Sequence, residues 1–386
     1  MRPESTIRDG VPKRVAVVFN AEPAPQANPA KELGVDDAEP PQSADRPSSR
    51  EADAEVAEVA EHVRAILARA GHFALTVPVV DTLDHLPALF EHEAIDTVFN
   101  LVEALDGDAR REPEMARLCE TLRLPYTGNG PGIMRLALAK DMAKRLLASH
   151  GVPVPQGFAV LDATQVADPE AHGLAYPVFV KPARTDASIG IDRHSVCADL
   201  AAVQARLAWL ARDLAGPFVV EEYLPGREIN VAILPDPFTG QCVPTEIDFS
   251  GYPKDIPPIV TYDCKWLPGC PESVAHSIPA RDRLTAAQYV EVCRIARTAF
   301  LALGGTSYGR VDMRFDAHGT PRVIDINPNC DIHPEAGMSI AAASVGYGPE
   351  DLVLTILAGA SLKARHVSAP HSVSRPRIIG HVASAN

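Results

Sequence analysis

The alternation of apolar and polar residues predicts a β-hairpin over residues 309–329 (GRVDMRFDAHGTPRVIDINPN). Successive side chains of a strand point to opposite faces, so each half of the hairpin has an apolar face and a mostly polar face. The turn-forming residues 316–319 (DAHG) would join the two strands as antiparallel neighbours. The predicted polar face carries Arg310, Asp312 and Arg314 on the first strand and Val323, Asp325 and Asn327 on the second. A half-exposed hairpin facing water is one interpretation. The short oxygen-bearing side chains and the arginines also fit a binding site.

The first third of the chain has the pattern of an α/β unit. Residues 14–19 (RVAVVF) predict a buried strand, and residues 51–70 place apolar side chains at helical spacing. Short apolar runs at residues 74–80 and 97–101 predict two further strands. Strand–helix–strand alternation is typical of a parallel sheet with helices on its faces. Residues 21–50, rich in proline, alanine and charge, predict a long mobile loop.

The remainder mixes strands and helices. Apolar runs predict strands at residues 176–182 and 218–223, and a further strand at 228–234 that continues the same sheet. Helices are predicted from Lys140 to about residue 149 and over residues 284–303. The segment GNGPG (residues 128–132) resembles a phosphate-binding loop, but it follows PYT in mid-domain and is interpreted as a turn.

Composition narrows the range of partners. The 386 residues are 46% hydrophobic and 22% charged, with a net charge of −14, so duplex nucleic acid and anionic membranes are poor partners. The N-terminus lacks the apolar core of a signal peptide, and no run approaches a membrane span. Seven cysteines without a CxxC pair or zinc-type spacing predict a reduced, cytosolic protein.

Several polar residues follow predicted strands. Lys181, before a proline, is either a surface lysine or a phosphate ligand, and the small-residue loop after it contains Ser188. Glu221, Glu222 and Glu228 lie near strand ends, where they are either solvated or accept hydrogen bonds from an adenine amine and a ribose diol. No glycine-rich turn follows the first strand and no GxxxxGK[ST] motif occurs, so a nucleotide would bind elsewhere.

In order and spacing, the chain resembles the ATP-grasp carboxylate–amine ligases, and most closely the D-alanine–D-alanine ligase group. The resemblance runs from about Phe99 to Leu357. Its segments are FNLVEALDGDARRE, PYTGNG, LAKDMAK followed by GVPVP, VFVKPARTDASIGI, VEEYLPGREINVAIL, YDCKW, GRVDMRFD and VIDINPN. The resemblance implies an α/β fold with an N-terminal Rossmann-like (pre-ATP-grasp) domain and a two-part α+β ATP-grasp domain. It also implies ATP and magnesium or manganese as cofactors, and often a homodimer.

The resemblance implies a role for each matching residue. Lys140, Lys181 and Lys265 would contact ATP phosphates, Glu221 with its neighbour Glu222 and the backbone near Leu224 would meet adenine, and Glu228 would meet ribose. Ser188 lies in the loop over the phosphates, and Tyr262 lies with Lys265 in a mobile loop that closes the site. Asp312, Asp325 and Asn327 would bind the metal, whose preference for hard oxygen ligands they satisfy. Arg310 would face the reacting carbonyl.

The chain departs from the family pattern at its substrate ends. Asn20-Ala21-Glu22 replaces the usual glycine-rich turn with its serine and glutamate, so Glu22 is only a candidate substrate ligand. Near the place of a serine that grips the second substrate's carboxylate stand His333 and Glu335; a glutamate there would attract an amine or guanidinium instead. Asp325 replaces a usual glutamate. Glu103 and Glu112 either line the substrate side or are solvated loop carboxylates.

The sequence therefore predicts an Mg-ATP-dependent ligase that joins an amino-acid-like carboxylate to an amine, both small molecules. D-alanyl-D-alanine synthesis and a specialised dipeptide or conjugate ligase both stay open. The rivals are a non-catalytic ATP-binding protein and an enzyme that activates a carboxylate for a thiol or a protein tail. The predicted divisions are a flexible N-terminus (1–13), an α/β domain (14–132), two ATP-grasp subdomains (133–225 and 226–365) and a loose tail (366–386).

Overall fold

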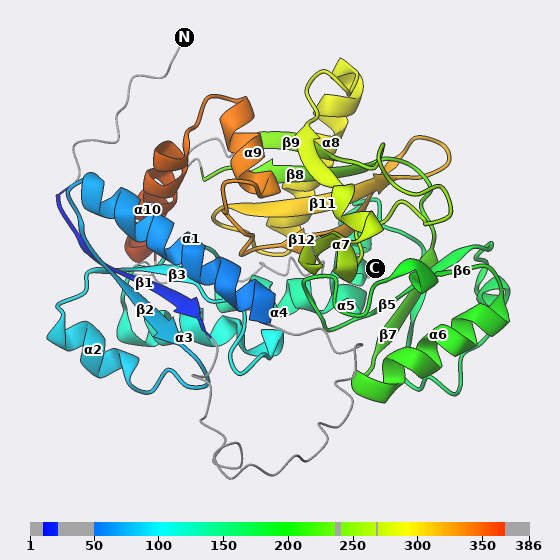
Figure 1. The fold of residues 1–386 in the computed structure, drawn as a ribbon, viewed down its shortest axis with the longest axis horizontal. Coiled ribbons are helices and arrows are strands. Elements are labelled where there is room, and N and C mark those ends of the chain that lie inside the picture. Colours follow the sequence, from blue (N-terminus) through cyan, green and yellow to red (C-terminus); the bar gives the residue numbers. More distant parts are fainter. Residues whose placement is uncertain (1–10, 22–49, 236–240, 268, 367–386) are drawn as a thin grey trace, which may run out of the picture.

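Three β-sheets organise the molecule (Figure 1). The structure is a computed structural model and describes residues 11–21, 50–235, 241–267 and 269–366. Glu22 and the tail after residue 366 lie outside these ranges, as does the predicted loop of residues 21–50 except for its first and last residues.

The N-terminal sheet confirms the predicted parallel arrangement. Its strands are β1 (Arg14–Asn20), β2 (Phe73–Val79) and β3 (Thr97–Leu101), in the order β2-β1-β3. Helices α1 (Arg50–Arg69) and α10 (Pro349–His366) pack on one face, and α2 (Leu86–His92) and α3 (Pro113–Leu122) on the other. The alternation of β1 divides its side chains between these two cores, with Val15 and Val17 in one and Ala16 and Val18 in the other.

A four-stranded antiparallel sheet follows, in the order β4-β7-β5-β6. Its strands are β4 (Gly157–Val160), β5 (Val178–Pro182), β6 (Val196–Cys197) and β7 (Phe218–Glu222). Helix α6 (Leu200–Asp213) packs on the face that holds Val178, Val180 and Val220. Lys181 and Glu221, which alternate with these residues, therefore point from the opposite face.

The five-stranded sheet, in the order β10-β9-β8-β11-β12, holds the predicted hairpin. Its strands are β8 (Glu228–Ile233), β9 (Cys242–Asp248), β10 (His276–Pro279), β11 (Gly309–Phe315) and β12 (Pro321–Asn327). The prediction that residues 228–234 continue the earlier sheet is wrong. The chain changes sheets at Gly226, whose N–H donates to the carbonyl of Phe315 over 3.0 Å; a Cβ on Gly226 would lie 2.4 Å from that oxygen. Only glycine allows so close an approach.

Helices cover both faces of the five-stranded sheet. Helices α4 (Pro131–Leu138), α5 (Lys140–Ser149) and α8 (Ala286–Ala302) share a core with its apolar face. Helix α9 (Gly337–Ser344) and α10 join the core that also contains β1 and β3. A short helix, α7 (Tyr262–Trp266), lies between the four-stranded and the five-stranded sheets in Figure 1. Short 3-10 turns occur at Ala109–Arg111, Pro169–His172, Arg193–Ser195 and Pro271–Val274. The predicted domain boundaries stay a prediction.

A β-bulge in the hairpin changes which residues lie on its polar face. Asp312 lies opposite Asp325 and Arg310 opposite Asn327, so these four residues share one face as predicted, but the register shifts between Asp312 and Met313. Met313 then pairs with Val323, which is buried in the apolar core. The extra residue reverses the alternation, so the prediction that Val323 shares the polar face is wrong.

Among the described helices, none alone is long and apolar enough to cross a membrane. Helices α9 and α10 pass that length and composition test only as a pair bent by 105°.

Candidate active site

Three lysines and two carboxylates meet where the four-stranded and the five-stranded sheets face each other. The ammonium of Lys181 lies 2.9 Å from Glu221 Oε1, and that of Lys144 pairs with the other oxygen of the same carboxylate. Lys140 lies 3.4 Å from Asp325 and donates to the carbonyl of Thr185 over 2.6 Å. Lys140 and Lys181, which the sequence places far apart, are thus brought together in the structure.

Local structure explains this convergence. Lys140 and Lys144 are one turn apart on α5 and so project from the same side of the helix. Lys181 and Glu221 sit on neighbouring strands, where Glu221 pairs directly with Phe179 and lies diagonal to Lys181. Lys144 is a site residue that sequence reasoning missed, and its four-residue spacing from Lys140 was the available signal.

The electrostatics of the cluster keep both carboxylates charged. Burial opposes ionisation of Glu221, but Lys144 and Lys181 outweigh it and lower the pKa of that carboxyl. Burial likewise opposes ionisation of Asp325, whereas Lys140 and the other two lysines lower its pKa. The cluster carries one more ammonium than carboxylate, so it suits an additional anion such as a phosphate.

The predicted metal ligands lie on β11 and β12, a surface called the metal face below. Both carboxylate oxygens of Asp312 accept from the guanidinium of Arg310, at 2.7 and 2.9 Å. Asn327 Oδ1 accepts from the backbone N–H of Asn329 over 3.1 Å. Asn230, opposite Asp312 on β8, adds an amide oxygen that is buried without a hydrogen-bond partner.

These donors fit a magnesium ion. Asp312, Asp325 and Asn327 occupy opposed positions of a single hairpin, and all present hard oxygens. The unpartnered oxygen of Asn230 on the same face is another acceptor that lacks a donor within the described chain. Among the described residues, no group of three or more His, Cys, Asp or Glu side chains is arranged to hold a metal ion. A bound nucleotide would therefore have to supply further ligands.

The residues expected around the nucleoside are held in place by the protein. Glu228 is buried beside Arg314, whose NH1 lies 3.3 Å from its carboxylate, and burial raises the pKa of Glu228 despite that arginine. Leu224 is buried, and Glu222 accepts from the backbone N–H of Gln156 over 3.0 Å. Both oxygens of Glu221 already have lysine partners. The predicted contacts with adenine and ribose stay predictions.

Two loops close over the phosphate side. The hydroxyl of Ser188 donates to the carbonyl of Val260 over 3.2 Å, and Trp266 Nε1 donates to the carbonyl of Ala187 over 3.1 Å. The N–H of Tyr262 donates to the carbonyl of Ile191 over 2.9 Å. Ala187 and Ser188 both have positive φ values, 53° and 62°, so the small-residue loop adopts a conformation that side chains disfavour. Such strain is typical of functional loops.

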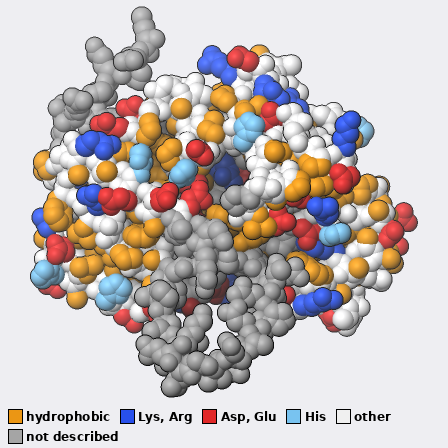
Figure 2. All heavy atoms as spheres, in the orientation of Figure 1, with side chains coloured by type: hydrophobic (Ala, Val, Ile, Leu, Met, Phe, Trp, Pro, Cys, Tyr) orange, Lys and Arg blue, Asp and Glu red, His pale blue; other side chains and the backbone are white. Residues whose placement is uncertain are grey.

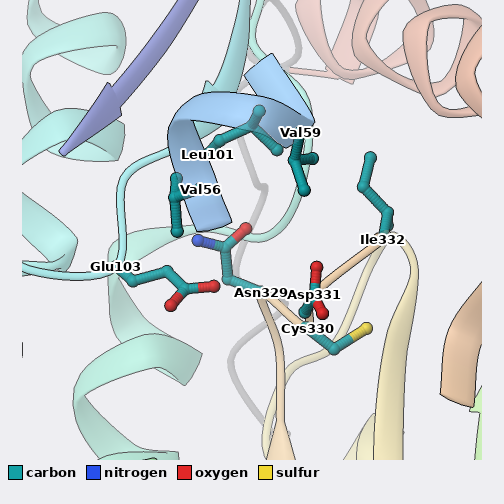
Figure 3. Close-up of a pocket in the computed structure, with 8 residues that line it drawn as sticks. All are labelled: Val56, Val59, Leu101, Glu103, Asn329, Cys330, Asp331 and Ile332. Atoms are coloured by element: carbon teal, nitrogen blue, oxygen red, sulfur yellow. The ribbon is translucent and has the colours of Figure 1, made fainter. Parts of the chain in front are cut away.

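A carboxylate-lined pocket lies below α1 (Figure 3). Glu103 and Asp331 line it together with apolar side chains such as Val56. Burial and the neighbouring carboxylates raise the pKa of Glu103 to about 8, an effect that Lys265 opposes. In Figure 2, acidic side chains gather beside a recess near the middle of the face that is shown.

The other predicted substrate residues are not among those that line this pocket. Glu112 is buried, so the solvated alternative is wrong for it; burial and nearby carboxylates raise its pKa. His333 lies 4.0 Å from Glu55, whose pKa is raised by burial and by Asp331. Glu335 is exposed, and its backbone N–H donates to His333.

The GNGPG segment is a turn only in part. The chain bends at Gly128, whereas Pro131 and Gly132 are the first residues of α4, so the prediction of a turn is wrong for the end of the segment. Its Asn129 is fully buried and donates to the carbonyls of Tyr308 and Pro328, while its oxygen accepts from the N–H of Thr306 and Ser307. These bonds tie the N-terminal domain to the start and the end of the hairpin.

Comparison with known proteins agrees with this geometry. Residues 146–358 match the family model of the D-ala D-ala ligase C-terminus. A D-alanine--D-alanine ligase of Synechococcus sp. (strain JA-3-3Ab) is 30% identical over 274 residues, which cover 71% of this chain and 80% of that protein. One from Cupriavidus taiwanensis is 28% identical over 265 residues, covering 67% and 75%.

The fold matches as well. The crystal structure of D-alanine--D-alanine ligase from Bacillus anthracis complexed with ATP superposes with a TM-score of 0.66, at 16% identity, over 92% of this chain and 99% of that one. The predicted α/β ATP-grasp fold is thereby confirmed. The chain belongs to the D-alanine–D-alanine ligase family of ATP-grasp enzymes.

Proposed function

We propose that this protein uses ATP to join an amino-acid-like carboxylate to an amine, releasing ADP and phosphate. The observation that carries the proposal is the meeting of Lys140, Lys181 and the surplus ammonium of Lys144 with the Asp312–Asp325 face. Cations for phosphates and oxygens for a metal lie on two sides of one cleft, as phosphoryl transfer requires.

In the first step, a carboxylate oxygen of the substrate attacks the γ-phosphorus, and the bond from that phosphorus to the β-phosphate oxygen breaks. ADP leaves, and the acyl phosphate remains. Lys140 and Lys181 would neutralise charge on the phosphate oxygens. Magnesium, held by Asp312, Asp325 and Asn327, would supply further neutralisation of charge on those oxygens.

In the second step, the amine nitrogen attacks the acyl carbon, the carbon–oxygen bond to phosphate breaks, and the nitrogen loses a proton. Arg310 would stabilise the oxyanion that forms, once its guanidinium turns from Asp312 toward the substrate. Closure of the loops around Ser188 and Trp266 would exclude water from the acyl phosphate. Lys265, exposed on α7, would complete the phosphate contacts on closure.

The amine is proposed to enter through the pocket of Figure 3, next to Asn329 and Cys330. Asp331 lines this pocket beside Glu103, and a cationic amine bound there would lower the raised pKa of Glu103, so that both carboxylates would attract the amine. D-alanine is one candidate for both substrates, because the relatives are D-alanine--D-alanine ligases. The acidic lining favours a second candidate, a specialised ligase whose acceptor carries an additional cationic group.

Phosphate release from Mg-ATP, measured across a panel of D- and L-amino acids and amines, tests the proposal. Release with D-alanine alone, with dialanine in the mass spectrum, would identify a D-alanine–D-alanine ligase. Release only with a basic acceptor would identify the specialised ligase. ATP binding without release for any pair would contradict the proposed activity and favour a non-catalytic ATP-binding protein.

We further propose a cytosolic homodimer, which family membership supports. All seven cysteines are free thiols, consistent with a reducing compartment. Light scattering on the purified protein tests the dimer, since the mass of one chain is 41.3 kDa.

A further inference from the structure

The ion pair between Lys144 and Glu221 joins the two sheets between which the nucleotide is proposed to bind. Helix α5, which carries Lys144, packs through Ala143 and Leu147 into the core of the five-stranded sheet. Glu221 belongs to β7 of the four-stranded sheet. The side chain of Lys144 is 12% exposed and that of Glu221 is 4% exposed, so the pair is largely shielded from water.

The cluster holds three ammonium groups and two carboxylates, so Lys144 has no carboxylate of its own. Lys140 pairs with Asp325, and Lys181 shares Glu221 with Lys144. Holding an ammonium away from water is costly when it lacks a counter-ion of its own. Burial accordingly lowers the pKa of Lys144 to about 8, in spite of Glu221. Because Lys144 and Lys181 share the carboxylate of Glu221, the arrangement suits a site in which one of the two lysines can move to another anion.

We propose that Lys144 is a positioning residue of the nucleotide site: it holds Glu221 charged and oriented for the 6-amino group of adenine while Lys181 turns to the phosphates. The inference rests on the proposed function. Lys181 lies 3.3 Å from the carbonyl of Ile324 as well as beside Glu221, so a small movement carries it toward the metal face. When Lys181 leaves, Lys144 remains the partner of the Glu221 carboxylate.

Without Lys144, Lys181 becomes the only cation on Glu221. When the phosphates draw Lys181 away, the buried carboxylate of Glu221 is left without a cation and takes up a proton. ATP should then lose more affinity than ITP, because inosine has a 6-oxo group and gives Glu221 no amino hydrogen to accept. The ratio of the affinity for ATP to the affinity for ITP therefore reports whether Lys144 supports Glu221 as an adenine ligand.

Calorimetric titration of Mg-ATP and Mg-ITP, without amino acids, tests the inference. Wild type should prefer ATP by about tenfold or more, and K144M should reduce that preference to within about threefold. K144R, which keeps the charge, should retain it. R145M on the exposed side of the same helix is the matched control and should behave as wild type.

A K144M protein that binds ATP and ITP in the wild-type ratio would overturn the inference. If K144M fails to fold, E221M decides, since methionine has no oxygen to accept from the 6-amino group; an unchanged ratio in E221M overturns the inference as well. If both fold, the K144M/E221M double variant should show no further loss of preference beyond E221M. Wild type that binds neither nucleotide would contradict the proposed function itself, a result distinct from an unchanged ratio.

Discussion

Arg310 and Asp312 hold each other through two parallel hydrogen bonds of 2.7 and 2.9 Å on strand β11. Burial disfavours the charged guanidinium, but Asp312 outweighs it and raises the pKa of Arg310. One residue is the proposed oxyanion ligand and the other a proposed metal ligand. The pair therefore has to separate before either can act, and metal binding competes with the arginine for the same carboxylate.

Arg310→Ala should separate these two roles. Removing the guanidinium frees Asp312, so the affinity for Mn²⁺ in the presence of ADP should be retained or increased, as measured by electron paramagnetic resonance. Turnover should fall by about 10²–10³-fold, the usual loss for one positioned oxyanion donor. Arg310→Lys serves as the control that keeps a charge. Full turnover in Arg310→Ala would remove this residue from the mechanism.

Asp325→Asn should weaken metal binding. The substitution removes a hard anionic ligand and also the counter-ion of Lys140, which lies 3.4 Å away. The affinity for Mn²⁺ with ADP should fall by about tenfold or more, a loss seen even for outer partners of metal ligands. Asp325→Glu restores the side chain usual in the family and should bind metal within about threefold of wild type. Equal affinity in all three proteins would exclude Asp325 as a ligand.

Trp266→Phe should loosen the closed loops. The change removes the 3.1 Å hydrogen bond from the indole to Ala187 but keeps an aromatic ring near Tyr262. One such bond contributes about 0.5–1.5 kcal/mol, so KM for ATP should rise by roughly 2- to 10-fold without a matching fall in kcat. Steady-state kinetics measure both constants. Trp209→Phe on α6, whose ring lies under Arg206 in another part of the molecule, should leave KM unchanged.

The alternation of the hairpin, together with the family resemblance that singled out Lys140 and Lys181, allowed much of this site to be predicted. Lys140, Lys181, Asp312 and Asp325 do converge, because helical and strand periodicity fix the side from which each side chain projects. Where a single residue changes the periodicity, the prediction failed. The bulge at Ile324 moved Val323 into the core, and nothing in the pattern of apolar residues distinguishes a bulged strand from a regular one.

Contacts between separate elements were beyond prediction for a different reason. Lys144 lies in a plain amphipathic helix, and its role depends on how α5 packs across from β7. Glu112 reads as a loop carboxylate, yet it is buried because the N-terminal domain packs beside Asn329. Lys144 and Glu221 are 77 residues apart in the sequence, and only the tertiary fold brings their side chains into contact.

Glu103→Gln should change how stability depends on pH. Burial and nearby carboxylates raise the folded pKa of Glu103 from the model-compound value of 4.5 to about 8. Between these values the unfolded chain has released this proton and the folded chain still holds it, so wild-type stability falls as pH rises through that window. Glutamine removes this penalty, and because the side chain is only partly buried the gain at pH 8.5 should be about 1–2 kcal/mol. At pH 4 the two proteins should differ little. Urea unfolding at pH 4, 6 and 8.5 measures the difference, with Glu335→Gln on the exposed loop as the control. A constant difference between wild type and Glu103→Gln across this range would show that the pocket holds Glu103 ionised, and would favour a cation-filled pocket.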